Sequence, residues 1–336
     1  MPRIREPLGL IPNVIRQREL IISDNNKRIQ RIVTAFTSIV KRLQPQVDNL
    51  AKTIELENIK TRAALVRLPE YTQLVGDYTQ QLDDFVGMVR IDLDDVINWS
   101  SAAALAGVTQ WAADFGITIQ NKWSVDQLSI LLDYLKPGGA LADRIALWAP
   151  NAVQGVSQTI IDMVIAGKNP RTIASALVKQ FGVPLTDALR TTRTVQLWSY
   201  RETTRAFYKA NPDVSAGWIW YAQLDEATCM SCIAQHGTFH TWDEALDDHY
   251  NGRCSQIPVP VGFEDYVRAN IVKQSGEDWF NTQTPEQQAK QMGADKLAAW
   301  QAGKFTFDKL SVQEQVDVYG SMRFESSLKD LIGENK

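Results

Sequence analysis

The sequence predicts a mainly α-helical protein with long amino-terminal helices and an α+β carboxy-terminal domain that contains one small β element. Three observations support this fold class. Apolar residues recur at helical spacing over most of the chain. Glycine and proline divide the second half into short helical segments. Aromatic and β-branched residues, which favour strands, gather only around a cluster of cysteines and histidines.

The first long helix is predicted to start at Asp24, an amino-terminal capping residue type. Ile29, Phe36, Leu43 and Leu50 follow at intervals of seven residues and form one apolar seam. This seam indicates packing in a helical bundle, with a partner-binding or self-associating arm as the alternative. Pro45 is expected to kink or restart the helix.

Charge is distributed unevenly over the first hundred residues. Residues 1–70 carry thirteen Lys and Arg against seven Asp and Glu, whereas residues 71–100 carry six aspartates against one arginine. Two solvated helix faces explain this pattern most simply. The alternative is that the basic arm contacts nucleic acid or an acidic partner.

Helical character continues over residues 71–135, and the turn K-P-G-G at Lys136–Gly139 marks a predicted domain boundary. A helix in this first part is indicated by apolar positions that are mostly three or four residues apart: Leu74, Tyr78, Leu82, Phe85, Val89 and Ile91. The chain is therefore expected to comprise an amino-terminal helical region, residues 1–138, and a second domain, residues 139–336.

The second domain is expected to open with short helices broken at residues 167–170 and 182–184, followed by one long helix to Asn211. Two or three short strands are then expected at the β-prone runs 218–221, 237–242 and 255–261, the last of which contains prolines typical of an edge strand. Two short helices that end in glycine are predicted after Gly262.

Composition excludes several classes of protein. A net charge of −4 argues against a surface built to coat nucleic acid, and 44% apolar residues exclude a disordered chain. The sequence shows no secretory signal and no apolar run of about 20 residues, so no membrane partner is expected. Three cysteines in a reducing cytoplasm are expected to be thiols or metal ligands.

All three cysteines and all three histidines lie within residues 225–259. The pair Cys229 and Cys232 has the C-x2-C spacing of a metal knuckle, and zinc takes four such ligands in a tetrahedron. With Cys254 and His249 downstream, the predicted zinc ligands are Cys229, Cys232, His249 and Cys254. The spare candidates are His236, expected to stabilise a turn, and His240, expected on a strand.

Four explanations compete for this cluster. A closed Cys3His site is structural, because it leaves no open position for water. A redox C-x-x-C motif would require a βαβ pattern that is absent here, and a disulfide between Cys229 and Cys232 is sterically poor. The enzymatic rival is a His-Asn-His nuclease, since D-D-H-Y-N around His249 resembles its signature. Counting ligands disfavours this rival, because a catalytic histidine would be lost to the knuckle.

The run D-E-A-T-C-M-S-C with H-Y-N-G-R-C-S-Q-I-P-V resembles the signature of the Mu gpF-like phage minor head proteins, the phage head morphogenesis domain. The matching positions are Asp225, Thr228, Cys229, Cys232, Gly237, His249, Arg253, Cys254, Pro258 and Val259. Gly252 stands where the family usually has a further cysteine, and Val195 where it has a glutamate. The resemblance covers roughly residues 150–335.

The resemblance implies a structural protein rather than an enzyme. Members are minor capsid components inside the head at the portal vertex, and in some phages they are delivered with the DNA. The implied partners are the portal protein, the major capsid or scaffolding protein, and packaged DNA as a non-specific contact of the basic arm. The implied location is the virion, after assembly in the host cytoplasm.

Overall fold

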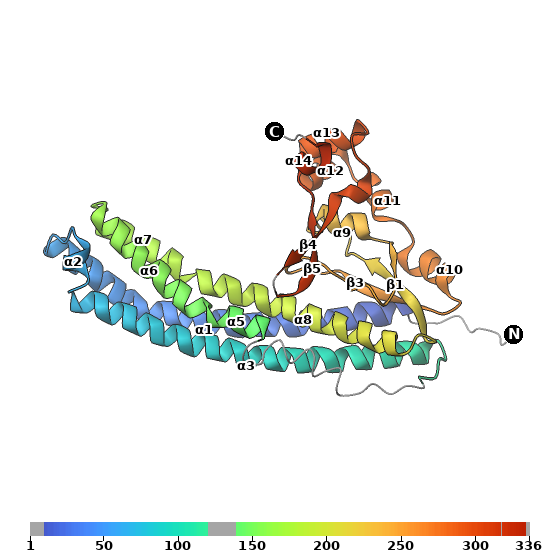
Figure 1. The fold of residues 1–336 in the computed structure, drawn as a ribbon, viewed down its shortest axis with the longest axis horizontal. Helices are drawn as coiled ribbons and strands as arrows, with labels where there is room; N and C mark the ends of the chain where they lie inside the picture. Colours follow the sequence, from blue (N-terminus) through green and yellow to red (C-terminus); the bar gives the residue numbers. More distant parts are fainter. Residues whose placement is uncertain (1–9, 120–138, 317, 334–336) are drawn as a thin grey trace. The chain divides into compact units, whose positions relative to one another are not determined.

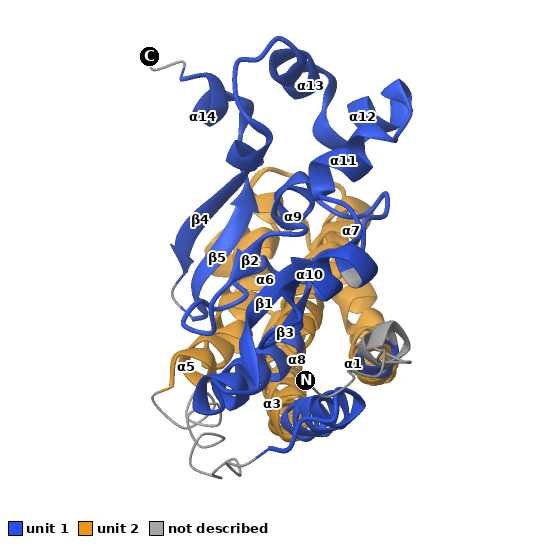
Figure 2. Cartoon of the chain, turned by 90° about the vertical axis from the view of Figure 1, so that its right-hand side faces the viewer, with its two compact units in different colours: residues 1–21, 99–130, 197–336 blue, residues 22–98, 131–196 orange. Residues whose placement is uncertain are grey.

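The computed structural model describes residues 10–119, 139–316 and 318–333, and confirms a mainly helical fold with small antiparallel sheets (Figure 1). Its contacts divide into two compact units (Figure 2). Unit 1 comprises residues 1–21, 99–130 and 197–336, and unit 2 comprises residues 22–98 and 131–196. Three helices contribute residues to both units: α1 (Leu10–Leu56), α3 (Pro69–Asp114) and α8 (Val183–Ala210).

Unit 2 is helical. Besides its parts of α1, α3 and α8 it contains α2 (Arg62–Leu65), α5 (Ala140–Ala146), α6 (Trp148–Ile165) and α7 (Pro170–Phe181). The predicted break before Pro170 is confirmed: Asn169 caps α7 by accepting a hydrogen bond from the Arg171 N–H, and Pro170 occupies the first turn. A second break at Gly182 precedes α8, the predicted long helix.

The predicted start of the first helix at Asp24 is wrong, because α1 already begins at Leu10. Asp24 does not cap the helix, since its carboxylate binds Arg28 Nε at 2.6 Å and accepts a hydrogen bond from Gln196 Nε2 at 2.9 Å. The expected restart at Pro45 is also wrong, since α1 continues through this residue to Leu56.

The predicted apolar seam of α1 forms the core of unit 2. Phe36, Leu43 and Leu50 are buried, and Phe36 meets Phe85 of α3 edge to face at 5.1 Å between ring centroids. The predicted positions of α3 are buried from Leu74 to Val89. The prediction that Ile91 belongs to this apolar face is wrong: Ile91 is 68% exposed, because the helical spacing after Val89 continues at the buried Leu93.

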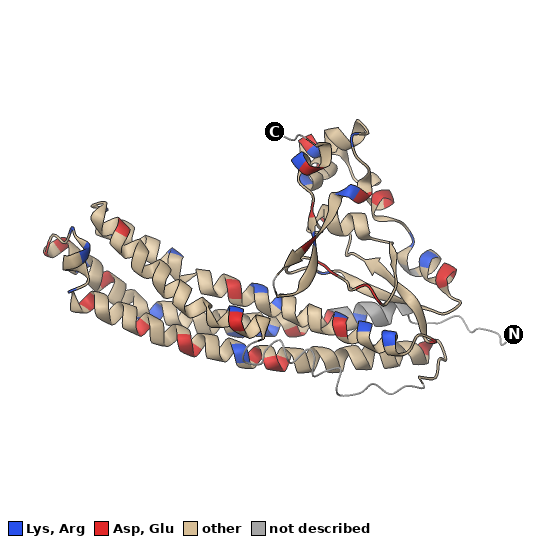
Figure 3. Cartoon of the chain, viewed as in Figure 1, with Lys and Arg blue, Asp and Glu red and all other residues tan. Residues whose placement is uncertain are grey.

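Charged residues of both signs occur along the long helices (Figure 3). Within unit 2, Arg28 Nη1 and Arg31 Nη2 bind Asp92 Oδ1 of α3 at 3.2 and 2.7 Å. Part of the basic excess of α1 is thus neutralised by the acidic segment that follows it. The exposed cations of α1 include Lys27, Lys41, Arg42 and Lys52.

Unit 1 contains a three-stranded antiparallel sheet of order β2-β1-β3, made of β1 (Ser215–Tyr221), β2 (Phe239–His240) and β3 (Ser255–Pro260). All three β-prone runs form strands, and the proline-containing β3 lies at an edge. Trp218 and Trp220 of β1 are fully buried in a core shared with Trp111 of α3 and Tyr208 of α8. This core lies beside the cysteines and supports them.

The chain after β3 contains more elements than the two short helices predicted. It forms α10 (Glu264–Val267), η1 (Arg268–Val272), α11 (Gly276–Asn281), α12 (Pro285–Met292), α13 (Ala294–Gln301), η2 (Phe307–Leu310) and α14 (Leu328–Ile332). A capping box at Thr284, followed by Pro285, starts α12 and so divides the first predicted helix in two.

An antiparallel hairpin of β4 (Ser311–Val316) and β5 (Gly320–Glu325) is absent from the sequence prediction. Most of β4 is exposed, so its sequence carries no apolar alternation. The hairpin is tied to the rest of unit 1 by Asp247, whose Oδ1 accepts from Arg323 Nε at 2.9 Å and whose Oδ2 accepts from Gln313 Nε2 at 2.6 Å.

The predicted helix over residues 123–135 and the turn from Lys136 lie outside the described residues, so the division of the chain at residue 138 stays a prediction. Among the helices that the structure describes, none combines the length and the apolar character needed to cross a bilayer.

Replacing Phe36 by Ala should destabilise unit 2 by about 3 kcal/mol, because it empties a buried site against Phe85. Chemical denaturation followed by circular dichroism measures this loss. The exposed neighbour Thr37→Ala is the control and should change stability by less than about 0.5 kcal/mol. Equal effects of the two substitutions would contradict the packing described for α1.

Candidate metal centre

The C-x2-C pair is held by the first turn of α9 (Met230–Gln235). Cys229 is the amino-terminal cap of this helix, and its Sγ accepts a hydrogen bond from the Cys232 N–H at 3.4 Å. Cys232 lies within the first turn and is buried, whereas Cys229 is half-buried. The helix start therefore directs both sulfur atoms to the same side.

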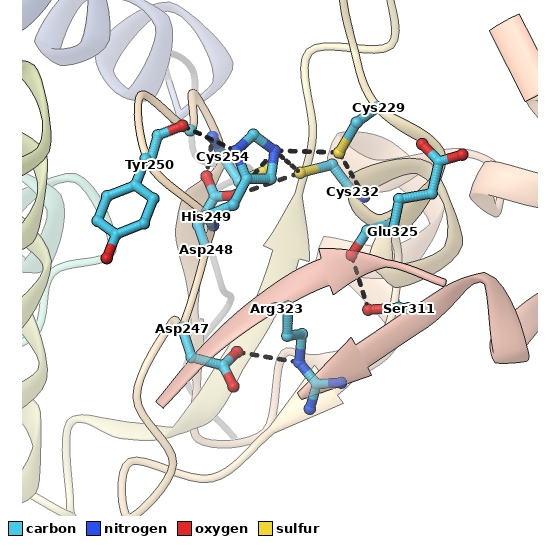
Figure 4. Close-up of polar contacts among 12 residues, drawn as sticks. Cys229, Cys232, Asp247, Asp248, His249, Tyr250, Cys254, Ser311, Arg323 and Glu325 are labelled. Atoms are coloured by element: carbon cyan, nitrogen blue, oxygen red, sulfur yellow. Dashed lines mark hydrogen bonds and ion pairs between the residues drawn. The ribbon is translucent and has the colours of Figure 1, made fainter. Parts of the chain in front are cut away.

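The loop between β2 and β3 supplies the other half of the cluster. The Nε2 atom of His249 lies 3.0 Å from Cys229 Sγ and 3.4 Å from Cys232 Sγ (Figure 4). Cys254, directly before β3, has its sulfur within 4.8 Å of Cys232 Sγ and of an Asp248 oxygen. All four predicted ligands thus come together, with Cys232 common to both groups.

This donor set fits a zinc ion. Zinc bound by sulfur at about 2.3 Å and by nitrogen at about 2.0 Å implies separations of roughly 3.5–3.8 Å between ligand atoms. The distances from His249 Nε2 to the two sulfur atoms are close to these values. The assignment of the four residues as ligands stays a prediction, but their placement is compatible with it.

Without a metal, the cluster favours a thiolate–imidazolium pair. The hydrogen bond with Cys232 is the main factor that lowers the pKa of Cys229 to about 5, against the effect of burial, and His249 lowers it further. Burial alone would lower the pKa of His249, but Cys229 and Asp248 outweigh it and raise this pKa to about 9. Burial raises the pKa of Cys254.

Asp248 and Arg201 are further parts of the centre, and the sequence alone did not indicate them. Arg201 of α8 binds the fully buried carboxylate of Asp248, with Nη2 3.0 Å from Oδ2. Asp248 lies in the D-D-H-Y-N run, and from the sequence this run indicates only a likeness to a nuclease signature. No local pattern links this run to α8, since 47 residues separate the two partners.

Several motif residues support the turn that carries Cys229. Asp225 Oδ1 accepts hydrogen bonds from Thr228 Oγ1 and from the Ala227 N–H, at 2.9 and 3.0 Å. Arg253 reaches both oxygens of the same carboxylate, at 2.7 and 2.6 Å, and is the main reason that the pKa of Asp225 falls to about 2. This ion pair connects the two loops that supply the cysteines.

The other two histidines have separate roles in the described structure. His236 is buried, and its Nδ1 accepts a hydrogen bond from the Ala222 N–H at 3.0 Å. His240 stacks on Trp218 and lies between Thr238 Oγ1 and Glu244 Oε2, at 2.8 and 3.0 Å. Neither belongs to the candidate metal groups found among the described residues.

The surroundings of His249 bear on the nuclease alternative. A His-Asn-His enzyme needs an imidazole that can take a proton from water. His249 Nε2 instead faces two sulfur atoms, and Nδ1 lies 2.9 Å from the Tyr250 carbonyl oxygen. The geometry therefore favours a knuckle over a general base at this residue.

Comparison with known families agrees with the motif. Residues 154–257 match the family described as Phage Mu protein F like protein. The match covers about a third of the chain, from α6 to β3, and contains Cys229, Cys232, His249 and Cys254. It confirms the resemblance over these residues, and the extension of the resemblance to residue 335 stays a prediction. This is a family of phage head morphogenesis proteins, generally structural. No curated protein and no solved structure matches the chain.

The burial of His236 predicts a pH dependence of stability. Burial lowers the pKa of His236 to about 4, so the folded protein keeps this imidazole neutral where the unfolded chain would bind a proton. Stability should therefore fall as pH drops from about 6.5 to 4, by at most about 3 kcal/mol.

The measurement is denaturation of the metal-free protein at several pH values. His236→Asn, which keeps an acceptor for the Ala222 N–H, should flatten the pH dependence between 4 and 6.5. An unchanged slope would show that His236 is not the group responsible.

Proposed function

We propose that this chain is a structural minor head protein of a tailed phage, located inside the capsid at the portal vertex, where it supports head assembly and DNA packaging or ejection. The observation that carries the proposal is the match of residues 154–257 to the Mu F-like family, which includes the whole Cys/His cluster. Within this proposal, the cluster binds one structural zinc ion.

A structural role fits the chemistry of the donor set. Three thiolates and one imidazole fill a tetrahedron and leave no position for water or substrate. The element that the ion would close is small, since β2 has two residues and β3 has six. The ion would therefore supply folding energy that this β element lacks.

The proposed partners are the portal protein, the major capsid or scaffolding protein, and packaged DNA. Contact with DNA is supported by the exposed cations Lys41 and Arg42 on α1. The support is local, because Arg28 and Arg31 bind Asp92 and the net charge of the chain is −4. Contacts to DNA would thus be few and independent of base sequence.

Elemental analysis of the purified protein should find about one zinc per chain, and Cys229→Ser should lose both the zinc and the stability that it provides. The control is Glu226→Gln: this residue is exposed, lies three positions before Cys229 and pairs with Lys290, so zinc content should not change. Absence of any bound metal in the wild type would contradict the proposed site.

The head function is tested in particles of the phage that encodes the chain. Heads assembled with Lys41→Glu and Arg42→Glu should still contain the protein and the portal, but should retain less DNA. The double charge reversal changes surface charge alone. Deletion of residues 1–60 would be a less specific test, because it would also remove the buried Phe36, Leu43 and Leu50. The matched control is Lys329→Glu, an exposed lysine of α14.

Absence of the protein from purified heads would contradict the proposal. So would divalent-metal-dependent nicking of plasmid DNA by the purified chain that His249→Ala abolishes, since the nuclease alternative predicts that activity.

A further inference from the structure

We propose that Asp248 is the positioning residue of the metal centre: with Arg201, its carboxylate orders the loop from His249 to Cys254 before any ion binds. This inference rests on the zinc site of the proposed function. It assigns a role to a residue that supplies none of the four expected ligands.

The carboxylate of Asp248 contacts three of those four ligand residues. Its Oδ1 accepts hydrogen bonds from the His249 N–H at 2.9 Å and from Cys232 Sγ at 3.2 Å. Its Oδ2 accepts from the Cys254 N–H at 3.1 Å. One side chain therefore links α9 to both ends of the ligand-bearing loop.

Arg201 fixes the same loop from α8. Its Nη2 donates to Asp248 Oδ2 at 3.0 Å, to the Gly252 carbonyl oxygen at 3.1 Å and to the Cys254 carbonyl oxygen at 2.6 Å. Both side chains are buried, with exposed fractions of 8% for Arg201 and 0% for Asp248. Both oxygens of Asp248 accept hydrogen bonds, whereas Arg201 bonds through Nη2 and its buried Nε has no hydrogen-bond partner among the described residues.

Gly252 lies directly against the carboxylate of Asp248. A Cβ atom at residue 252 would lie 2.0 Å from Asp248 Oδ2 and 2.1 Å from its Cγ. The carboxylate thus occupies the space that any side chain at residue 252 would need. With Asp248 in place, glycine is required here because of the close approach of the carboxylate and not because of a special backbone angle.

The competing assignment makes Asp248 itself a metal ligand, since one of its oxygens lies within 4.8 Å of the sulfur atoms of Cys232 and Cys254. The hydrogen bonds argue against it. Three N–H donors that remain when Cys232 is a thiolate already bind the two oxygens, namely those of Arg201, Cys254 and His249. A carboxylate saturated by donors is typical of a group that orients ligands.

The test is Asp248→Asn, assayed by competition with a zinc chelator. The amide has nearly the same shape, but whichever way it is turned its NH2 group faces donors in place of acceptors. Zinc affinity should fall about 10-fold to 100-fold. The matched control is Asp247→Asn. The carboxylate of Asp247 faces Arg323 and Gln313 and not the ligand residues, so the zinc affinity of this variant should stay within about 3-fold of the wild type.

Cobalt substitution separates positioning from ligation. A positioning role predicts that cobalt-loaded Asp248→Asn keeps the thiolate charge-transfer and ligand-field bands of the wild type at saturating metal. Altered bands would show that the carboxylate is a ligand and would overturn the proposal. Wild-type affinity in Asp248→Asn would overturn it as well.

Gly252→Ala gives a second, independent route where Asp248→Asn does not fold. It should weaken zinc binding by a similar factor, and the loss should shrink in an Asp248→Ala background, which removes the obstructing carboxylate. Equal losses in both backgrounds would overturn the coupling of these two residues.

Hydrogen exchange of the Cys254 N–H tests the positioning role without depending on zinc binding. In metal-free wild type the Cys254 N–H should be protected, and Asp248→Ala, which removes the acceptor, should abolish that protection. This result would support the positioning role even if the wild type bound no zinc. Fast exchange of Cys254 in the metal-free wild type would overturn the role, whether or not zinc binds.

Discussion

The structure of unit 1 depends on one junction, the meeting of the first turn of α9 with the loop that precedes β3. The sheet itself is small, and β2 pairs with β1 at only two positions. Sulfur and imidazole groups at the junction connect the two segments, and the Arg201–Asp248 pair extends the connection to α8. Elements far apart in the sequence are thereby fixed around one buried point.

Unit 2 has a different organising principle. Its helices pack through an apolar seam, but polar side chains set their register. Asn25 Nδ2 donates to Gln196 Oε1, and Gln196 Nε2 donates to Asp24, so α1 and α8 are matched at one level. Arg28 connects α1 to Asp92 of α3 close to the same level. Sliding any one of these helices would leave buried polar groups unpaired, which is costly.

The sequence was sufficient to predict the long helices, the strands around the cluster and the four-residue cluster, because each of these carries a local signal. Repeated apolar spacing marks α1 and α3, and C-x2-C spacing marks the start of α9. The hairpin β4–β5 could not be predicted, because it is stabilised by side-chain contacts to Asp247 from a distant loop. The same reason hid Asp248, whose partner Arg201 is identified only when the chain is folded. The predicted helix start at Asp24 is wrong because a residue type that caps helices can also lie inside one, where Asp24 binds the side chains of Arg28 and Gln196.

The prolines of β3 have a consequence for the pairing of this sheet with further strands. Successive N–H groups of a strand point alternately to its two neighbours, and those of residues 255, 257 and 259 are available to β1. The opposite side of β3 belongs to Gln256, Pro258 and Pro260, and two of these three have no N–H to donate. A strand from a second molecule would find one donor where it needs three. Five of the six residues of β3 are also buried, so this border of the sheet is closed to pairing with a further strand.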